Sequence, residues 1–166
     1  MGITLKIDNV DDLLIDILGV PNYALNDAIR WVEITEIFEK AISSARDLLI
    51  IDAETDRYQD CQPYIQICYE DDGAMTIEAV SSHFLDPGLS PDAQNTLVEL
   101  GWQVTDDPKL PNYFQFLHND EASSSEIAEL FTKTFRNVYG ISPTDTIEIR
   151  ARKGIWPSGR EEEEYE

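Results

Sequence analysis

The side chains best suited to chemistry in this sequence are two histidines and two cysteines, and their spacing builds no recognisable site. His83 and His118 lie far apart, and neither belongs to a paired-histidine metal motif. Cys61 and Cys68 are separated by six residues, whereas the cysteines of structural zinc sites usually lie about two to four residues apart and need a second ligand pair. We therefore expect free thiols, no metal site and no cofactor.

Carboxylates are abundant, but their spacing does not match a calcium loop or a phosphate site. The acidic run at residues 70–72 precedes Gly73, a composition typical of a solvated turn. A calcium loop needs ligands at alternating positions over about twelve residues, and this run lacks that pattern. The sequence also lacks the glycine-rich phosphate-binding motifs and the GxSxG motif of serine hydrolases. These features predict a protein that is not an enzyme.

Net charge is the most distinctive property of the composition. The 166 residues include 33 Asp and Glu against 12 Lys and Arg, which gives a formal net charge of −21. Such a chain repels phosphate backbones and anionic lipid surfaces, so we expect neither nucleic-acid nor membrane binding. No apolar run approaches the roughly 18 residues of a membrane-spanning helix, and the acidic N-terminal sequence is unlike a signal peptide. These properties predict a cytoplasmic protein.

Hydrophobic periodicity predicts the elements that would carry binding residues in the first half of the chain. Apolar residues recur at intervals of three and four from about Asn26 to Arg46, which predicts a long helix. The apolar run at 48–51 predicts a buried strand. From Pro63 the period changes to two, and the turn residues 71–73 separate two alternating runs. This pattern predicts a β-hairpin.

The second half of the chain predicts two more helices and two more strands. Ser90-Pro91 has the composition of a helix N-terminus, and Ser123 with Glu126 forms a capping-box pattern for a third helix. Residues 102–105 and 112–118 predict strands. The expected order is helix, three strands, helix, two strands, helix. Such hairpins with half-polar faces predict an α+β fold, in which helices pack on an antiparallel sheet.

The length of the chain is that of a single domain, which we expect to span residues 26–150. Residues 1–25 hold a short strand pattern at 3–7 and a short helical pattern at 11–18, and they predict an N-terminal appendage. Residues 151–166 combine basic residues with a run of four glutamates, which predicts a charged C-terminal tail.

Several short motifs follow one another in a specific order between residues 31 and 142. They are Pro63-Tyr64 with Gln66, Ala79 with Ser81-Ser82, Phe84-Leu85, Leu100-Gly101-Trp102, Asn112-Tyr113, and Thr134 with Val138-Tyr139-Gly140. In this order they resemble the TY-Chap domains of actinobacteria, which share a superfamily with YbjN-like proteins and type III secretion chaperones. The resemblance implies a chaperone-like α-βββ-α-ββ-α fold and a peptide- or partner-binding role without catalysis. It is also compatible with a homodimer.

The predicted sheet is rich in aromatic residues, and an outward sheet face or edge could hold an extended peptide through backbone pairing and apolar contacts. Together with the resemblance, this predicts a non-enzymatic, chaperone-like module that binds a peptide or protein segment on its sheet and first helix. The residues expected near the contact surface are Trp31, Phe38, Tyr64, Gln66, Phe84 and Tyr113. For each of them, an ordinary place in the core is the alternative.

A second interpretation follows from the charge alone. An acidic decoy or regulator would bind a basic protein electrostatically, and such binding would weaken steeply as salt screens the exposed charges.

Overall fold

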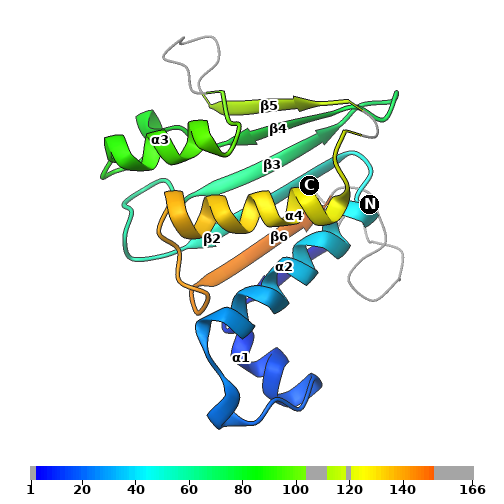
Figure 1. The fold of residues 1–166 in the computed structure, drawn as a ribbon, viewed down its shortest axis with the longest axis vertical. Helices are drawn as coiled ribbons and strands as arrows, with labels where there is room; N and C mark the ends of the chain where they lie inside the picture. Colours follow the sequence, from blue (N-terminus) through cyan, green and yellow to red (C-terminus); the bar gives the residue numbers. More distant parts are fainter. Residues whose placement is uncertain (1–2, 104–111, 119–120, 152–166) are drawn as a thin grey trace.

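A six-stranded antiparallel sheet organises the computed structural model, which describes residues 3–103, 112–118 and 121–151 (Figure 1). The strand order across the sheet is β1-β6-β2-β3-β4-β5. The strands are β1 (Ile3–Ile7), β2 (Leu48–Glu54), β3 (Tyr64–Tyr69), β4 (Met75–Ala79), β5 (Tyr113–Leu117) and β6 (Thr146–Ala151). The predicted α+β class with an antiparallel sheet is therefore confirmed.

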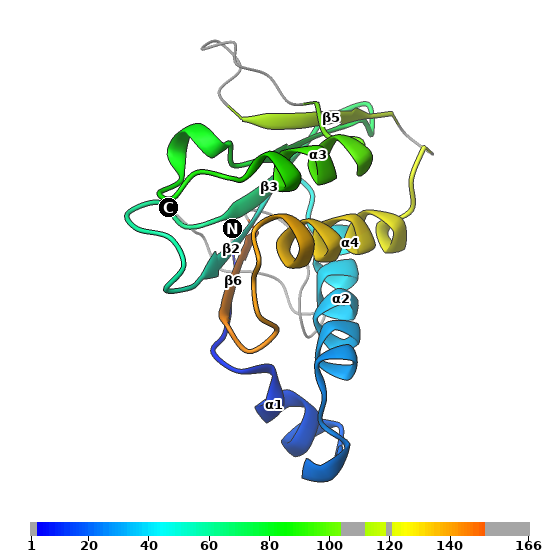
Figure 2. The ribbon, with the colours of Figure 1, turned by 60° about the vertical axis from the view of Figure 1, so that its left-hand side comes forward.

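The helices lie on one side of this sheet (Figure 2). The α-helices are α1 (Val10–Asp12), α2 (Asp27–Ser44), α3 (Pro91–Glu99) and α4 (Ser124–Lys133). Single π-helical turns extend α1 and α4, namely η1 (Leu13–Ile17) and η4 (Thr134–Val138), and short 3₁₀ turns form η2 (Asn22–Ala24) and η3 (Ser82–Phe84). No helix among these described residues is long and apolar enough to cross a bilayer.

Side-chain caps begin the three longest helices, as the sequence predicts. The Asn26 side chain accepts a hydrogen bond from the backbone N–H of Ile29 at 3.0 Å, and α2 follows. Ser90 caps α3 through the N–H of Ala93. Ser123 and Glu126 form both hydrogen bonds of a capping box at the start of α4. These bonds satisfy backbone donors that have no partner within the helix, so these helix starts are encoded locally.

The central strands also follow the predicted pattern. The hairpin of β3 and β4 pairs Ile67 with Ile77, and β2 pairs with β3 on its other side. The buried side chains of these strands alternate with half-buried ones. One sheet face therefore meets α2 and α4, and the apolar core lies between them.

The structure differs from the predicted order after the last helix, where β6 lies between β1 and β2. No strand was predicted over residues 146–151, where the alternation of Ile147, Ile149 and Ala151 with polar residues is short. The predicted strand at 102–105 is represented by a single bridge between Gln103 and Phe114. Residues 104–111 and the rest of the predicted tail, 152–166, lie outside the described residues.

Polar side chains in the core have hydrogen-bond partners that tie distant segments together. The hydroxyl of Tyr58 donates to the carbonyl of Tyr139 at 2.7 Å, and the hydroxyl of Tyr139 donates to the carbonyl of Val80 at 2.7 Å. The indole N–H of Trp102 donates to Oγ1 of Thr134 at 3.0 Å. Burial raises the pKa of Tyr139 well above its ordinary value, so its hydroxyl remains protonated and available as a donor.

Candidate functional site

The sheet face opposite the helices is not covered by any described helix (Figure 2). We call it the open sheet face. Strand alternation places every second side chain on it, because the residues between them belong to the buried core. Its members are Thr4, Lys6, Ile50, Asp52, Tyr64, Gln66, Cys68, Thr76, Glu78, Phe114, Phe116, Glu148 and Arg150.

The centre of the open sheet face is polar. Nη2 of Arg150 lies 2.6 Å from Oδ2 of Asp52, and Nε of Arg150 lies 3.5 Å from Oε1 of Glu148. On the neighbouring strands, the side-chain amide of Gln66 donates a hydrogen bond to the carboxylate of Glu78. These cross-strand contacts confirm that the side chains share one face.

The β5 end of the open sheet face is aromatic. The rings of Phe114 and Phe116 meet edge to face, with centroids 5.1 Å apart. Phe116 is 59% exposed. Phe114 beside it is half-buried. An aromatic pair with one exposed ring, beside a sheet face without a described helix, is a feature of contact surfaces, because aromatic rings contribute much of the energy of interfaces.

Of the six residues predicted at the contact surface, Tyr64 and Gln66 lie on the open sheet face. The hydroxyl of Tyr64 accepts a hydrogen bond from Nδ2 of Asn112 at 3.1 Å. Burial raises the pKa of Tyr64, and the bond from Asn112 partly opposes that rise. Tyr64 is therefore a neutral, half-buried ring that is held in place on this face.

Phe84 lies in η3, beyond the end of β4, and is 44% exposed. Its ring contacts His83 edge to face, with centroids 5.3 Å apart. Tyr113 supports the same turn from the buried side, because its hydroxyl accepts a hydrogen bond from the N–H of Ser82 at 3.1 Å. Phe84 is thus the most exposed member of the predicted set.

Trp31, Phe38 and Tyr113 are buried in the core. Trp31 and Phe38 lie on the face of α2 that packs inward, and the ring of Phe38 contacts that of Phe135 with centroids 6.0 Å apart. The structure therefore divides the predicted set between the open sheet face, the η3 turn and the buried core. Phe114 and Phe116 were not in that set, although adjacent aromatic residues in a strand must point to opposite faces.

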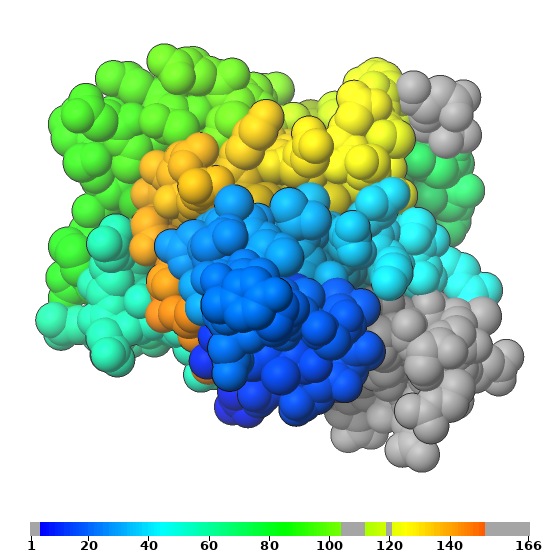
Figure 3. Space-filling view, turned by 60° about the horizontal axis from the view of Figure 1, so that its bottom comes forward, coloured from blue at the N-terminus to red at the C-terminus, as the bar shows by residue number. Residues whose placement is uncertain are grey.

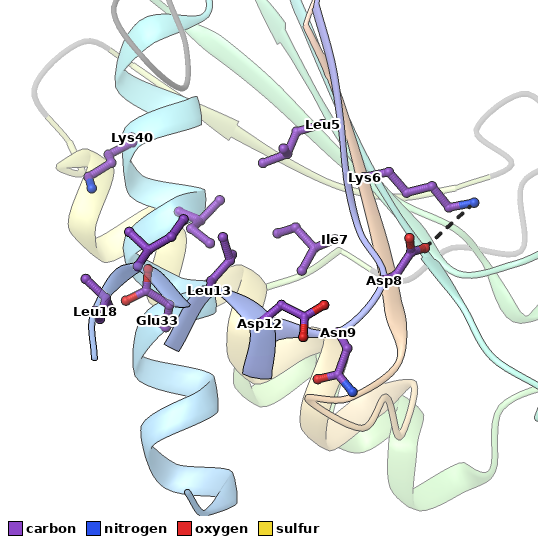
Figure 4. A pocket seen from close by; sticks show the side chains of 12 residues that line it. Leu5, Lys6, Ile7, Asp8, Asn9, Asp12, Leu13, Leu18, Glu33 and Lys40 are labelled. Carbon is purple, nitrogen blue, oxygen red and sulfur yellow. Dashed lines mark ion pairs between the residues drawn. The ribbon is translucent and has the colours of Figure 1, made fainter. Parts of the chain in front are cut away.

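A second surface is an apolar groove between β1, the α1–η1 turn and α2 (Figure 4). It has a volume of about 450 Å³, and Leu5 and Ile7 of β1 point into it toward α2. Its apolar walls are Leu5, Ile7, Leu13, Ile17, Leu18 and Ile37, and its polar rim is Lys6, Asp8, Asn9, Asp12, Glu33 and Lys40. The periodicity of the sequence does not show this groove, because it depends on how the N-terminal segment docks.

The N-terminal segment is anchored to α2, and the space-filling view shows it packed over that helix in dark blue (Figure 3). The guanidinium of Arg30 donates two hydrogen bonds to the carboxylate of Asp11, at 2.6 and 3.1 Å. Asn9 caps α1, and Val10 and Leu14 are buried in the core. Residues 3–18 thus pack as part of the domain.

Glu33 on the groove rim predicts a pH dependence of stability. Burial raises its pKa above the ordinary value; Glu36 adds to the rise, and Lys40 opposes it. Folding therefore favours the protonated carboxyl of Glu33. Its contribution to the free energy of unfolding is lost as the pH rises above about 4.5. Compared with Glu33→Gln, the wild type should lose unfolding free energy between pH 4.5 and 7, measured by urea unfolding across that range. Parallel pH profiles for the two proteins would contradict this assignment.

Within the described ranges, no cluster of three or more His, Cys, Asp or Glu side chains has the proximity needed for a metal ion. Cys61 and Cys68 are both half-buried. The arrangement found in this part of the chain offers apolar and backbone contacts to a partner.

Comparison with known proteins gives one family match. The family described as T3SS (YopN, CesT) and YbjN peptide-binding chaperone 3, or TY-Chap3, matches residues 27–153. That range begins at α2 and includes β2 to β6 with the helices between them. No curated protein and no solved structure matches the chain significantly.

Proposed function

Since the chain belongs to the TY-Chap3 family of peptide-binding chaperones, we propose that it is a non-enzymatic, chaperone-like protein that holds a client segment in extended form. In this proposal it works in the cytoplasm and binds neither nucleic acid nor membranes. The observation that carries the proposal is the aromatic pair of exposed Phe116 and half-buried Phe114, beside a sheet face that no described helix covers.

The client segment would lie across the open sheet face and contact the β5 end most closely. Phe116 and Phe114 would supply apolar area, and Gln66 with its Glu78 partner would offer hydrogen-bonding groups beside them. Register supports this grouping, because Phe114 pairs with Glu78 and Glu78 pairs with Gln66 on adjacent strands. Tyr64 and Phe84 would extend the contact beyond these strands.

The buried members of the predicted set would act from behind this surface. Tyr113 precedes Phe114 on β5 and is fixed by its bond from Ser82, so it holds the strand that presents the aromatic pair. Trp31 and Phe38 would support the sheet through the packing of α2. Their contribution to binding would therefore be indirect.

Substitution of Phe116 tests the proposal. We would probe the protein with an array of random dodecapeptides and measure affinities for the peptides that bind. Phe116→Ser should weaken binding about tenfold, since burying a Phe side chain is worth about 1.5–3 kcal/mol. The matched control is Val98→Ser on α3, because Val98 is also 59% exposed but lies on a helix; it should leave affinity unchanged.

Salt separates this proposal from the acidic-decoy interpretation. Binding through apolar and backbone contacts should persist in 1 M NaCl, where the Debye length is only about 3 Å. An array on which only basic peptides bind, and from which they all dissociate in 1 M NaCl, would favour the decoy. An array without any binding peptide, or equal affinities for the wild type and Phe116→Ser, would also contradict the proposed site.

A further inference from the structure

The outer edge of β1 carries no other strand among the described residues. β1 is the terminal strand of the sheet and pairs only with β6 among the described strands. Alternate residues of such an edge turn their backbone N–H and C=O groups outward, which makes the edge a template for an additional strand. The other sheet edge differs, because Gln103 forms a two-bond bridge with Phe114 of β5.

The groove described above lies directly beside this edge. Leu5 and Ile7 of β1 form part of its wall (Figure 4). A strand added to β1 would lie about 4.8 Å from it, with every second side chain on the same face as these two residues. Those side chains would enter the groove between β1 and α2, whereas the side chains between them would face the opposite way.

The groove also exposes large apolar side chains at its mouth. Ile17 is 72% exposed, and Leu18 beside it is more than half exposed. Both line the groove. Contiguous exposed apolar surface with a polar rim is typical of a binding site, and here it adjoins a strand edge that no other described strand pairs with.

The charge of the rim indicates which kind of segment fits. Lys6 is paired with Asp8 at 3.9 Å. Asp12 and Glu33 have no ion pair with another described side chain, and Lys40 is the one remaining cation among the groove-lining residues. The rim is therefore net acidic, within a chain of net charge −21. A bound segment with a Lys or Arg would be attracted, and an acidic segment would be repelled.

We propose that β1 and its groove form a second peptide site, which takes an extended segment of a partner protein with apolar residues at alternate positions and at least one Lys or Arg. The segment pairs with the outer edge of β1, and its apolar side chains fill the groove. This site is distinct from the open sheet face. The residues that build most of it, 5–18, precede the family match at 27–153.

The test is selection from a phage-displayed library of random dodecapeptides. Peptides are selected on the wild type and counter-selected on a double variant, Ile17→Asp with Leu18→Asp, in which both changes fall on exposed side chains of the groove. The enriched peptides should have apolar residues at alternate positions, a Lys or Arg, and no central proline. Their affinity should fall at least tenfold on the double variant, and Glu33→Lys should also weaken it.

Two control variants distinguish a specific loss of the groove from a general loss of the fold. Ile15→Asp changes a neighbouring residue of η1 that does not line the groove, and Phe116→Ser changes the open sheet face. Both should bind the enriched peptides as the wild type does. If Phe116→Ser abolishes that binding, or if Ile15→Asp weakens it as much as the double variant does, the groove proposal fails.

Pairing between the peptide backbone and β1 is tested by a separate measurement. N-methylation of single peptide amides should abolish binding at every second position, because only alternate N–H groups of a paired strand face its neighbour. A selection that leaves no peptide after counter-selection would overturn the proposal. Apolar residues enriched at intervals of three and four, or an N-methyl series without a period of two, would overturn it as well.

Discussion

Replacing Phe38 by Ala should destabilise the protein by about 3–5 kcal/mol, the usual cost of removing a buried Phe side chain. Phe38 is fully buried on the inner face of α2, and its ring contacts that of Phe135. The change would leave a cavity between α2 and α4, which a packed core cannot refill. The midpoint of thermal unfolding should fall by roughly 10 °C or more, measured by circular dichroism.

Phe84→Ala is the matched control for this prediction. It removes the same side chain from a position that is 44% exposed, so its effect on stability should stay within roughly 0.5 kcal/mol. Equal losses of stability for the two variants would show that Phe38 is not a core residue in solution. The pair also separates the two roles predicted from the sequence, because only the Phe84 ring is exposed to solvent.

Replacing Leu14 by Ala should cost about 2–5 kcal/mol, although Leu14 lies within the segment that was predicted as an appendage. Its side chain is buried together with Val10 and packs into the common core. If residues 1–25 were an appendage, shortening the Leu14 side chain to Ala would leave the unfolding of the domain unchanged. If they are part of the domain, the whole protein should unfold in one transition at a lower temperature.

Ile17→Ala provides the comparison for Leu14→Ala within the same helical turn. Ile17 lies three residues further along η1 and is largely exposed, so its truncation should change stability by no more than about 0.5 kcal/mol. Calorimetry with Leu14→Ala, Ile17→Ala and the wild type measures both values. A separate low-temperature transition in Leu14→Ala, with the main transition unchanged, would instead support an independently folding appendage.

Much of the fold was predictable because its signals are local. Asn26, Ser90 and Ser123 each cap a helix through bonds that span three residues, so the starts of these helices depend on their own neighbours. The hairpin of β3 and β4 has a short turn and strict alternation, which are also local properties. These local features were sufficient to predict the α+β class.

The positions of β1 and β6 were not determined in this way. Their pairing joins Leu5 to Ile149 and Ile7 to Ile147, residues about 140 positions apart in the chain. Short apolar alternation permits a strand but does not choose its neighbour, because the neighbour is set by which edge remains free when the rest of the sheet has formed. The groove beside α2 exists only as a result of that pairing.

By itself, the sequence determined the helix starts, the central hairpin, the excess of negative charge and the family to which the chain belongs. The tertiary structure decided which aromatic residues are buried and which are exposed. Phe38 and Phe116 are chemically identical, and an apolar ring stabilises a core and a contact surface by the same removal of area from water. Only the packing of α2 against the sheet, and the absence of any described helix over the opposite face, assign Phe38 to the core and Phe116 to the surface.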